Sequence, residues 1–520
     1  MKFIHPILSC VEAQELERRL LNGDEAREWK AMNQAGRSLG IRVLDDFGEI
    51  GYFPECGRIL VLAGKGHNGG DAILAADEIL KAKNKAKVTV ALVLGDRGLK
   101  PLVRRSVELL LRNWGEQAEV LSWRDNEVER FEKVEWDICL DGIIGMQFQP
   151  PLKGIVERCV KWANERCRAR LRAAVDLPTG VGDGCSGVRF QADFTYATGI
   201  LKRPLLEPDC VDNVGRIRYL DIGFFEGDIE QNTGDYVLLS KTLQPVSEFR
   251  PSNSDKRSYG HLYLVGGSQR MPGAIQMAVR AAVKSGVGLV TAFVPKSVVA
   301  HFSAVIPEAM WVPMPETREG GLGLNGIEKI TETIDQASAL VVGPGMGKEK
   351  ETQELITRIA SETTVKLGID ADGLQNEVIK VLGKRPKGAG EVVITPHLGE
   401  FRRILDNKEN TEKKLDLCSF SFCHNVITVL KGRITRISDG DRTIHSFFGG
   451  PLLARGGSGD LLAGLVGSML ARPGADGLKA TCQAVALHGL ACDQLVQRRG
   501  AEAIRTTDLL EFLGEAIRCW

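Results

Sequence analysis

Short apolar runs alternate with amphipathic stretches along most of the chain. Residues 11–40 have the apolar spacing of helices. Residues 58–83 predict a buried strand, a glycine loop and an amphipathic helix. Further short apolar runs that predict strands lie at 87–96, 136–145, 172–180 and 193–199. Because strands that alternate with helices form parallel sheets covered on both faces, this half of the chain predicts an α/β domain.

A second series of the same kind follows a polar stretch. Apolar periodicity fades between Asp221 and Pro251, and residues 248–260 are rich in polar and turn-forming types, which indicates a domain boundary. Beyond it, a helix is expected at 273–285, and strands with their following loops are expected at 261–268, 288–295, 339–347, 366–374, 391–401 and 425–440. The sequence thus predicts two different α/β domains, residues 1–225 and 249–520, joined by a linker over 226–248.

Composition narrows the class of partner. The 520 residues include 67 Lys and Arg against 67 Asp and Glu, so net charge gives no reason to expect nucleic acid or an anionic membrane. The 12 cysteines are scattered without a C-x-x-C pair, as in reduced intracellular proteins. The apolar run near the N-terminus is too short for a signal peptide or a membrane span. We therefore expect a cytoplasmic protein with small-molecule partners. A homo-oligomer is also expected, although nothing in the composition indicates it.

In the first half, residues that can carry chemistry follow the predicted strands. Gly64, Gly66 and Gly69 form G-x-G-x-x-G between a strand and a helix, which is typical of dinucleotide binding, but no acidic residue is clearly placed about twenty positions later. Asn68 and Asp71 in the same turn offer oxygens to a cation or hydrogen bonds to a ligand. They could equally serve as a turn former and a helix cap.

Later strand ends in this half add further polar groups. Asp141 and Thr179 supply more oxygen atoms that could bind a cation. Asp176 beside Lys202 would make a proton-transferring pair, because the cation would hold the carboxylate ionised.

Three motifs in these loops resemble those of the NAD(P)H-hydrate epimerase domain over about residues 10–225. The family patterns G-x-G-N-N-G-G-D-G, D-A-x-x-G-T-G and V-D-I-P-S-G correspond to GKGHNGGDA, DGIIGMQ and VDLPTG here. The resemblance implies that a potassium ion is coordinated by Asn68, Asp141 and Thr179. It implies that Asp176, with Lys202, transfers a proton at C6 of the hydrated nicotinamide. The residues implied to hold that substrate are His67, Asn68, Gly69, Gly70, Asp71 and Asp176.

In the second half, the segment GGSGD, Gly456 to Asp460, precedes an apolar stretch with helical spacing. Bare amides at a helix N-terminus form an anion hole that suits charge on a transferring phosphoryl group. Asp460 inside that hole is placed to act as a general base toward an attacking hydroxyl. A glycine turn capped by Ser458 or Asp460 is the structural alternative.

Other loops of the second half also follow strands. These are the turn Gly343 to Gly347, the acidic pair Asp370 and Asp372, the pair His397 and Glu400, and the segment with Lys431, Gly432 and Thr435. A cation and a hydroxyl in the last segment suit nucleotide phosphates. Each loop taken alone also has a structural explanation, as a loop histidine or a solvated acidic turn.

The joint order of these loops resembles the ribokinase-like superfamily and, within it, the ADP- or ATP-dependent NAD(P)H-hydrate dehydratases. Six family patterns, among them G-P-G-L-G, T-P-H-P-G-E, L-K-G-x-x-T and G-G-T-G-D, have close versions across about residues 250–520. The resemblance implies that Asp460 is the base for phosphorylation of the C6 hydroxyl. It implies hydrate contacts from Ala274, Gly345, His397 and Asp460, and nucleotide contacts from Lys431, Gly432, Arg433, Ile434, Thr435 and Gly459.

Together the two resemblances imply a bifunctional repair enzyme that acts on hydrated NADH and NADPH. The first domain would interconvert R and S hydrates, and the second would phosphorylate the S form and eliminate phosphate. ADP is the expected co-substrate because the fused arrangement looks prokaryotic, and magnesium is expected to bridge its phosphates. A ribokinase-like small-molecule kinase fused to an inactive ligand-binding domain is one alternative. A degenerate ligand sensor as the first domain is another.

Overall fold

The computed structural model describes residues 3–184, 186–226, 233–405 and 416–518. The chain forms two compact units. The N-terminal unit comprises His5–Thr233 and Gln497–Ala501, and the C-terminal unit comprises Met1–Ile4, Gly234–Val496 and Glu502–Trp520. The expected linker, 226–248, includes β10 (Asp235–Leu238) and a 3-10 helix at Ser240–Val246, and its residues 227–232 lie outside the described residues.

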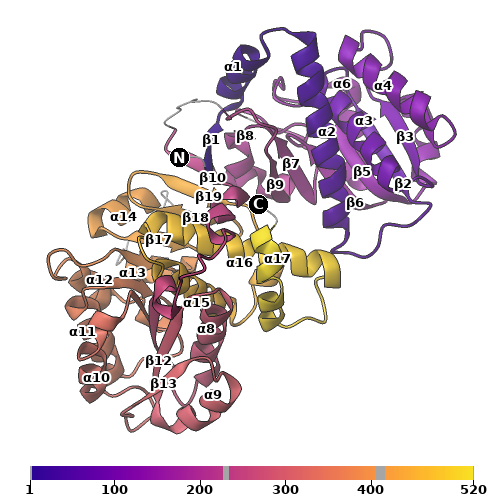
Figure 1. Ribbon diagram of the computed structural model, residues 1–520. Helices are drawn as coiled ribbons and strands as arrows, with labels where there is room; N and C mark the ends of the chain where they lie inside the picture. The colour runs from indigo at the N-terminus through magenta and orange to yellow at the C-terminus, as the bar shows by residue number, and fades with distance from the viewer. Residues whose placement is uncertain (1–2, 185, 227–232, 406–415, 519–520) are drawn as a thin grey trace. The chain divides into compact units, whose positions relative to one another are not determined.

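The N-terminal unit is built on a parallel sheet (Figure 1). Its strands are β2 (Arg58–Ala63), β3 (Lys87–Leu92), β4 (Ala118–Ser122), β5 (Trp136–Gly142), β6 (Ala169–Val175), β7 (Phe194–Thr198) and β9 (Arg216–Leu220). They lie in the order β4-β3-β2-β5-β6-β7-β9, and each neighbouring pair is parallel. The order reverses between β2 and β5, as in a doubly wound sheet. The predicted Rossmann-like fold is confirmed, while β4 and β9 were not predicted.

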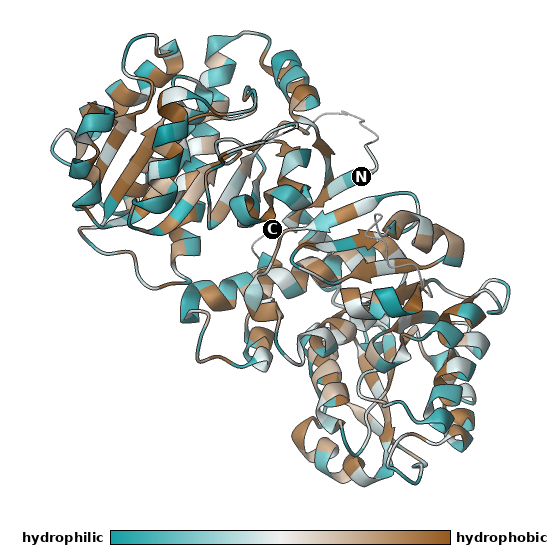
Figure 2. Cartoon of the chain, turned by 180° about the vertical axis from the view of Figure 1, so that it is seen from behind, coloured by the Kyte–Doolittle hydropathy of each residue, from teal (hydrophilic) through white to brown (hydrophobic). Residues whose placement is uncertain are grey.

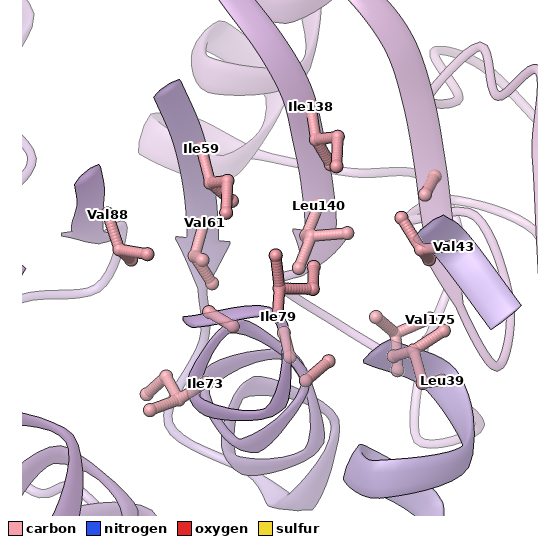
Figure 3. Packing of buried hydrophobic residues seen from close by; sticks show 14 of the residues in the cluster. Leu39, Val43, Ile59, Val61, Ile73, Ile79, Val88, Ile138, Leu140 and Val175 are labelled. Atoms are coloured by element: carbon pink, nitrogen blue, oxygen red, sulfur yellow. The ribbon is translucent and has the colours of Figure 1, made fainter. Parts of the chain in front are cut away.

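Helices cover both faces of this sheet, because successive strand residues point to opposite sides. The helices are α1 (Cys10–Leu21), α2 (Glu25–Phe47), α3 (His67–Ala82), α4 (Pro101–Trp114), α5 (Glu129–Glu132), α6 (Gly154–Glu165) and α7 (Val211–Val214). On one face Val61 and Leu140 pack against α2 and α3 (Figure 3). On the other, Leu60 and Cys139 pack with Trp162 of α6. The three-layer prediction is thereby confirmed.

A separate short pair of strands supports the N-terminal unit's site. In β1 (Ile4–Leu8), Leu8 pairs in parallel with Lys202 of β8 (Leu201–Lys202). Helix α1 begins directly after β1, so the pairing fixes the start of α1 beside the Lys202 backbone.

The C-terminal unit has a second sheet, parallel over most of its width. Its strands are β11 (His261–Val265), β12 (Leu289–Pro295), β13 (Met310–Met314), β14 (Ala339–Val342), β15 (Lys366–Ile369), β16 (Val392–Ile394), β17 (Ile427–Leu430), β18 (Thr435–Ser438), β19 (Thr443–Ser446) and β10. The order β13-β12-β11-β14-β15-β16-β17 is parallel and reverses between β11 and β14. Residues 425–440, expected to contain one strand, form the antiparallel pair β17 and β18, because the Lys431–Ile434 turn interrupts the apolar run.

Helices also cover both faces of the second sheet. They are α8 (Pro272–Lys284), α9 (Val299–Val305), α10 (Ile327–Thr331), α11 (Lys350–Glu362), α12 (Asn376–Leu382), α13 (Leu398–Ile404), α14 (Leu417–His424), α15 (Ser458–Leu470), α16 (Gly477–Arg499) and α17 (Leu513–Arg518). Helices α8 and α15 pack together over β11 and β14. Leu355 of α11 and Val378 of α12 join the core on the other face. Figure 2 shows apolar strands in each unit flanked by helices with polar outer surfaces. Within the described ranges, no helix is both long and apolar enough to cross a bilayer.

Candidate active sites

In the N-terminal unit the candidate residues gather where the strand order reverses. Gly64, after β2, donates its N–H to Gly142 O of β5 at 3.0 Å. A Cβ on Gly64 would lie only 1.8 Å from Ile143 O, so the two loops touch backbone to backbone. The Gly145 Cβ position lies 3.4 Å from Asn68 Oδ1, which places that side chain against the loop after β5. Ligand sites of doubly wound sheets occur at this reversal point.

Asp141 and Thr179 are joined by hydrogen bonds beneath Asn68. The Thr179 hydroxyl donates to Asp141 Oδ1 at 2.7 Å, and the Thr179 N–H donates to Asp141 Oδ2 at 2.7 Å. Both residues are buried. Burial raises the pKa of Asp141 to about 6, although the bonds from Thr179 oppose the shift. The donors to this buried carboxylate are neutral, so a cation beside it would be favourable.

Asp176 and Lys202 form a buried ion pair at the next strand end. Lys202 Nζ donates to Asp176 Oδ1, and the lysine side chain is fully buried. The same oxygen accepts from the Thr198 N–H at 3.3 Å and the Thr198 hydroxyl at 3.2 Å. Asp176 has φ of +64°, a left-handed conformation that is unfavourable for a non-glycine residue. Such strain is typical of functional sites.

The remaining candidates of this unit lie at the start of α3, between His67 and Asp71. His67 pairs with Glu28 of α2, Nε2 to Oε2, at 3.5 Å. Gly69 and Gly70 are buried, and a Cβ on Gly69 would lie 2.4 Å from Gly64 O. Asp71 is buried, and its Oδ1 makes no hydrogen bond within the described residues. The two glycines therefore allow close packing, and Asp71 has a carboxyl oxygen that is available to bind a ligand.

In the C-terminal unit the corresponding reversal point brings Ala274 and Gly345 together. The Gly267 N–H after β11 donates to Pro344 O after β14 at 2.8 Å. Gly345 has φ of +66°, and its Cβ position lies 2.9 Å from Ala274 Cβ and 2.5 Å from Met271 O. Only glycine fits this contact between the turn and the start of α8.

A second cluster forms around Lys431, at the end of β17. Lys431 Nζ donates to Asp370 Oδ1 at 2.9 Å, and the Thr395 hydroxyl donates to the same oxygen at 2.6 Å. Asp370 is almost fully buried. Burial works to lower the pKa of Lys431, but the charges of Asp370 and Glu400 outweigh it and raise the pKa above its usual value. The lysine is therefore a fixed positive charge.

Asp460 lies beside this positive charge. Helix α15 begins at Ser458 and not after Asp460, because Gly457 takes the left-handed φ of +88° and turns the chain into the helix. Asp460 therefore occupies the first helical turn. The Gly459 Cβ position lies 3.2 Å from Lys431 Nζ and 4.0 Å from Asp370 Oδ2. Burial raises the pKa of Asp460 to about 7, and the Asp370 charge adds to the shift while Lys431 opposes it.

The His397 side chain serves as the N-cap of α13. Its Nδ1 accepts from the Gly399 N–H at 3.0 Å and the Glu400 N–H at 3.2 Å, which caps α13. The Lys431 N–H donates to Pro396 O at 2.8 Å and holds the two loops together. Of the other expected nucleotide contacts, Gly432, Arg433 and Ile434 form the turn between β17 and β18, and Thr435 begins β18.

Asp370 was singled out from the sequence only as part of an acidic pair after a strand, and the structure shows that it holds Lys431. Two other residues at these sites were not selected from the sequence. His488 of α16 is buried, with Nε2 3.4 Å from the Ser458 hydroxyl, and burial lowers its pKa to about 4. Glu17 of α1 interacts electrostatically with Lys202 and Asp176. No local pattern distinguishes it from the other acidic residues of its helix.

The two halves of the chain match different family models. Residues 262–514 match the model described as NAD(P)H-hydrate dehydratase, and residues 30–204 match the model described as YjeF-related protein N-terminus. In the part of the chain that the structure describes, no three His, Cys, Asp or Glu side chains are grouped to hold a metal ion.

Curated relatives match both halves at once. The bifunctional NAD(P)H-hydrate repair enzyme Nnr of Gloeobacter violaceus is 30% identical over 478 residues, which cover 90% of this chain and 89% of that protein. The enzyme of the same name from Moorella thermoacetica is 29% identical over 469 residues, with coverage of 89% and 87%. A solved ADP/ATP-dependent NAD(P)H-hydrate dehydratase from Bacillus subtilis, co-crystallised with ATP and Mg²⁺, covers 54% of this chain and 96% of its own at 25% identity and a TM-score of 0.46.

Proposed function

The chain belongs to the family of bifunctional NAD(P)H-hydrate repair enzymes, and from that premise we propose how its two units divide the reaction. The N-terminal unit exchanges the R and S hydrates of NADH and NADPH. The C-terminal unit dehydrates the S hydrate with ADP as phosphoryl donor. The family expected from the loop motifs is confirmed, and the model matched by the second half is that of a dehydratase, which favours this function over a fused small-molecule kinase.

The observation that carries the dehydratase assignment is Asp460 in the first turn of α15, beside Lys431. A carboxyl group with a pKa near 7 is well matched to general-base catalysis at neutral pH. Asp460 would take the proton of the C6 hydroxyl as its oxygen attacks the terminal phosphorus of ADP. The amides that begin α15 and the Lys431 ammonium would stabilise the charge on the transferring group.

The second step follows from leaving-group chemistry, since hydroxide leaves poorly and phosphate leaves well. The C6–O bond breaks with its electron pair on phosphate, water takes up the proton that leaves C5, and the electrons of that C–H bond form the C5=C6 double bond of NADH or NADPH. Asp370 holds Lys431 in place, so that the Lys431 ammonium group lies where phosphate departs. Ala274 and Gly345, in contact at the reversal point, provide the close backbone approach that a flat nicotinamide ring requires.

Magnesium would bind chiefly through the nucleotide in this unit. Magnesium is commonly held by one or two carboxylates together with substrate phosphates. Asp370 and Asp372, whose charges act on Asp460, are the carboxylates placed for this. When bound, magnesium would neutralise charge on the transferred phosphoryl group.

The epimerase assignment is supported by Asp176 and Lys202, the buried ion pair in the N-terminal unit. The Lys202 ammonium lies against the Asp176 carboxylate, and Asp176 would accept a proton at the C6 centre. A potassium ion fits Asn68, Asp141 and Thr179, which supply amide, carboxylate and hydroxyl oxygens. The buried Asp141 carboxylate with neutral donors would gain a counter-charge, and the ion would fix the loop beside the hydrate.

The proposal is tested by incubating the purified chain with mixed NADH hydrates and ADP while NADH absorbance is followed. Conversion of both epimers is the expected result. Conversion of the S hydrate alone would refute the epimerase activity and would favour a degenerate ligand sensor as the N-terminal unit. No conversion, with phosphorylation of another small alcohol, would establish the kinase instead.

A further inference from the structure

Three carboxyl groups and one ammonium group act on one another in the N-terminal unit. Lys202 of β8 contacts the Asp176 carboxylate after β6. The charges of these two residues act on Asp71 of α3 and Glu17 of α1. If all three carboxyl groups were ionised, this cluster would carry a net charge of about −2 in a largely buried environment. Uncompensated charge is costly to bury, so the cluster retains a proton at neutral pH.

Helix α1 is held over this cluster at several points. The Cys10 and Val11 N–H groups donate to the Asp183 carboxylate at 3.1 and 3.2 Å, which caps the N-terminus of α1. Gln14 Nε2 donates to Met146 O, in the loop after β5, at 2.7 Å. Glu17 lies three residues beyond Gln14, on the same side of the helix, and is half-buried. Its carboxyl therefore joins the site while still reaching solvent.

Asp71 is the member of the cluster best placed to keep the proton. Its side chain is almost completely buried, with 9% of the residue exposed, and its Oδ1 has no hydrogen-bond partner in the described ranges. Burial, together with the charges of Asp176 and Glu17, raises the pKa of Asp71 well above its usual value, and Lys202 opposes the shift.

The other titratable groups nearby do not supply this proton. Burial raises the pKa of the Cys10 thiol to about 12, so it stays neutral across the working range. Asp183 is occupied in capping α1. Burial raises the pKa of Glu17 to about 7, and the Asp176 charge adds to this while Lys202 opposes it. Glu17 therefore exchanges protons with water near neutral pH.

We propose that Asp71 is the general acid of the epimerase reaction, with Asp176 as the base, and that Glu17 acts through Asp71 by returning its proton from solvent. This inference rests on the epimerase function proposed for the N-terminal unit. Exchange between two faces of one carbon requires both an acid and a base, and Asp176 with Lys202 supplies only the base.

The reaction then balances without any further reagent. Asp71 gives its proton to the C6 hydroxyl, the C6–O bond breaks with its electron pair on oxygen, and water departs while the ring-nitrogen lone pair forms an N1=C6 double bond. Water adds to the other face of C6, its electron pair forms the new C–O bond, and N1 regains its lone pair. Asp176 takes the released proton and passes it to solvent. Glu17 reprotonates Asp71 and is itself reprotonated by water.

The test compares the full-length wild type with the Asp71→Asn, Glu17→Gln and Glu15→Gln variants. R-to-S exchange of isolated hydrate is followed by chromatography from about pH 5.5 to 9. We expect Asp71→Asn to lower kcat at least ~100-fold with little change in KM. Wild-type exchange should fall as the pH rises through about 7, where Glu17 loses its proton. Glu17→Gln should be ~10-fold slower at acid pH and should lack that fall.

Glu15→Gln is the matched control, because Glu15 lies on the same helix with its side chain exposed, and it should behave as wild type. ADP-dependent dehydration of the S hydrate by the same samples reports on the other unit and should be unchanged in every variant. Wild-type kcat in Asp71→Asn, or a wild-type alkaline fall in Glu17→Gln, would overturn the assignment of that residue.

Two further measurements use only the wild type, so they remain informative even if a variant fails to fold. In water enriched in ¹⁸O, each exchange event should place the label on C6, and epimerisation that keeps the original oxygen would exclude the acid step. An exchange rate that does not fall between pH 6 and 8 would exclude Glu17. A wild type with no exchange at all would refute the epimerase function itself and not the assignment of these two residues.

Discussion

Replacing the proposed base Asp460 by Asn should abolish dehydration and, at neutral to alkaline pH, make the C-terminal unit more stable. The two effects have one cause. The site holds a carboxyl group whose ionised form is disfavoured by burial and by Asp370. Asn fills the same volume, cannot accept the proton of the C6 hydroxyl and carries no charge. Loss of function and gain of stability should therefore appear in the same variant.

The size of the effect follows from the pKa. Burial raises the pKa of Asp460 from 3.8 to about 7, a shift of about 3 units, and ~1.36 kcal/mol per unit gives about 4 kcal/mol. Because the unfolded chain releases this proton first, wild-type stability falls as the pH rises from about 4 to about 7 and the penalty is constant above that. Residual contact with water screens the charge, so we expect about 2 to 4 kcal/mol for Asp460→Asn at pH 8.

The assay is urea unfolding of full-length wild type and Asp460→Asn near pH 4.5 and at pH 8. The stability difference between variant and wild type should be larger at pH 8 by the amount above. Asp441→Asn, at an exposed turn of the same unit, is the control and should show no such pH-dependent difference. A difference that is equal at the two pH values would refute the argument, and so would a variant that retains dehydration.

Four further outcomes are expected. Asp176→Asn should slow R-to-S exchange at least ~100-fold and leave ADP-dependent dehydration of the S hydrate intact, as chromatography of the epimers would show. Replacing potassium by a large organic cation should slow exchange in the wild type, whereas Asp141→Asn should be slow and insensitive to the change. Gly345→Ala should raise KM for the hydrate and cost ~1–3 kcal/mol of stability, since its Cβ would lie 2.5 Å from Met271 O at φ +66°. Dehydratase kcat/KM should rise with pH through about 7 as Asp460 ionises, and a flat profile would remove that residue as the base.

Local sequence determined much of each sheet. Apolar runs such as 58–63 and 339–342 are long enough and bounded sharply enough by glycine to predict strands, and the loops after them contain the candidate residues. The family was predicted from the joint order of several loop motifs in each half, because each motif taken alone also has a structural explanation. Gly64 and Gly345, which belong to these motifs, allow close contacts between neighbouring loops.

Tertiary structure decided which side chains meet and how they are charged. Asp176 follows β6 and Lys202 ends β8, and only the tertiary fold brings these two residues into one ion pair. The pKa of Asp460 depends on Asp370, ninety residues earlier in the chain. The sequence around Glu17 is that of an ordinary helix. Only the placement of α1 in the fold brings the Glu17 carboxyl under the influence of the charges of Lys202 and Asp176. Sequence patterns report local backbone preference, whereas burial and charge are set by neighbours that are distant along the chain.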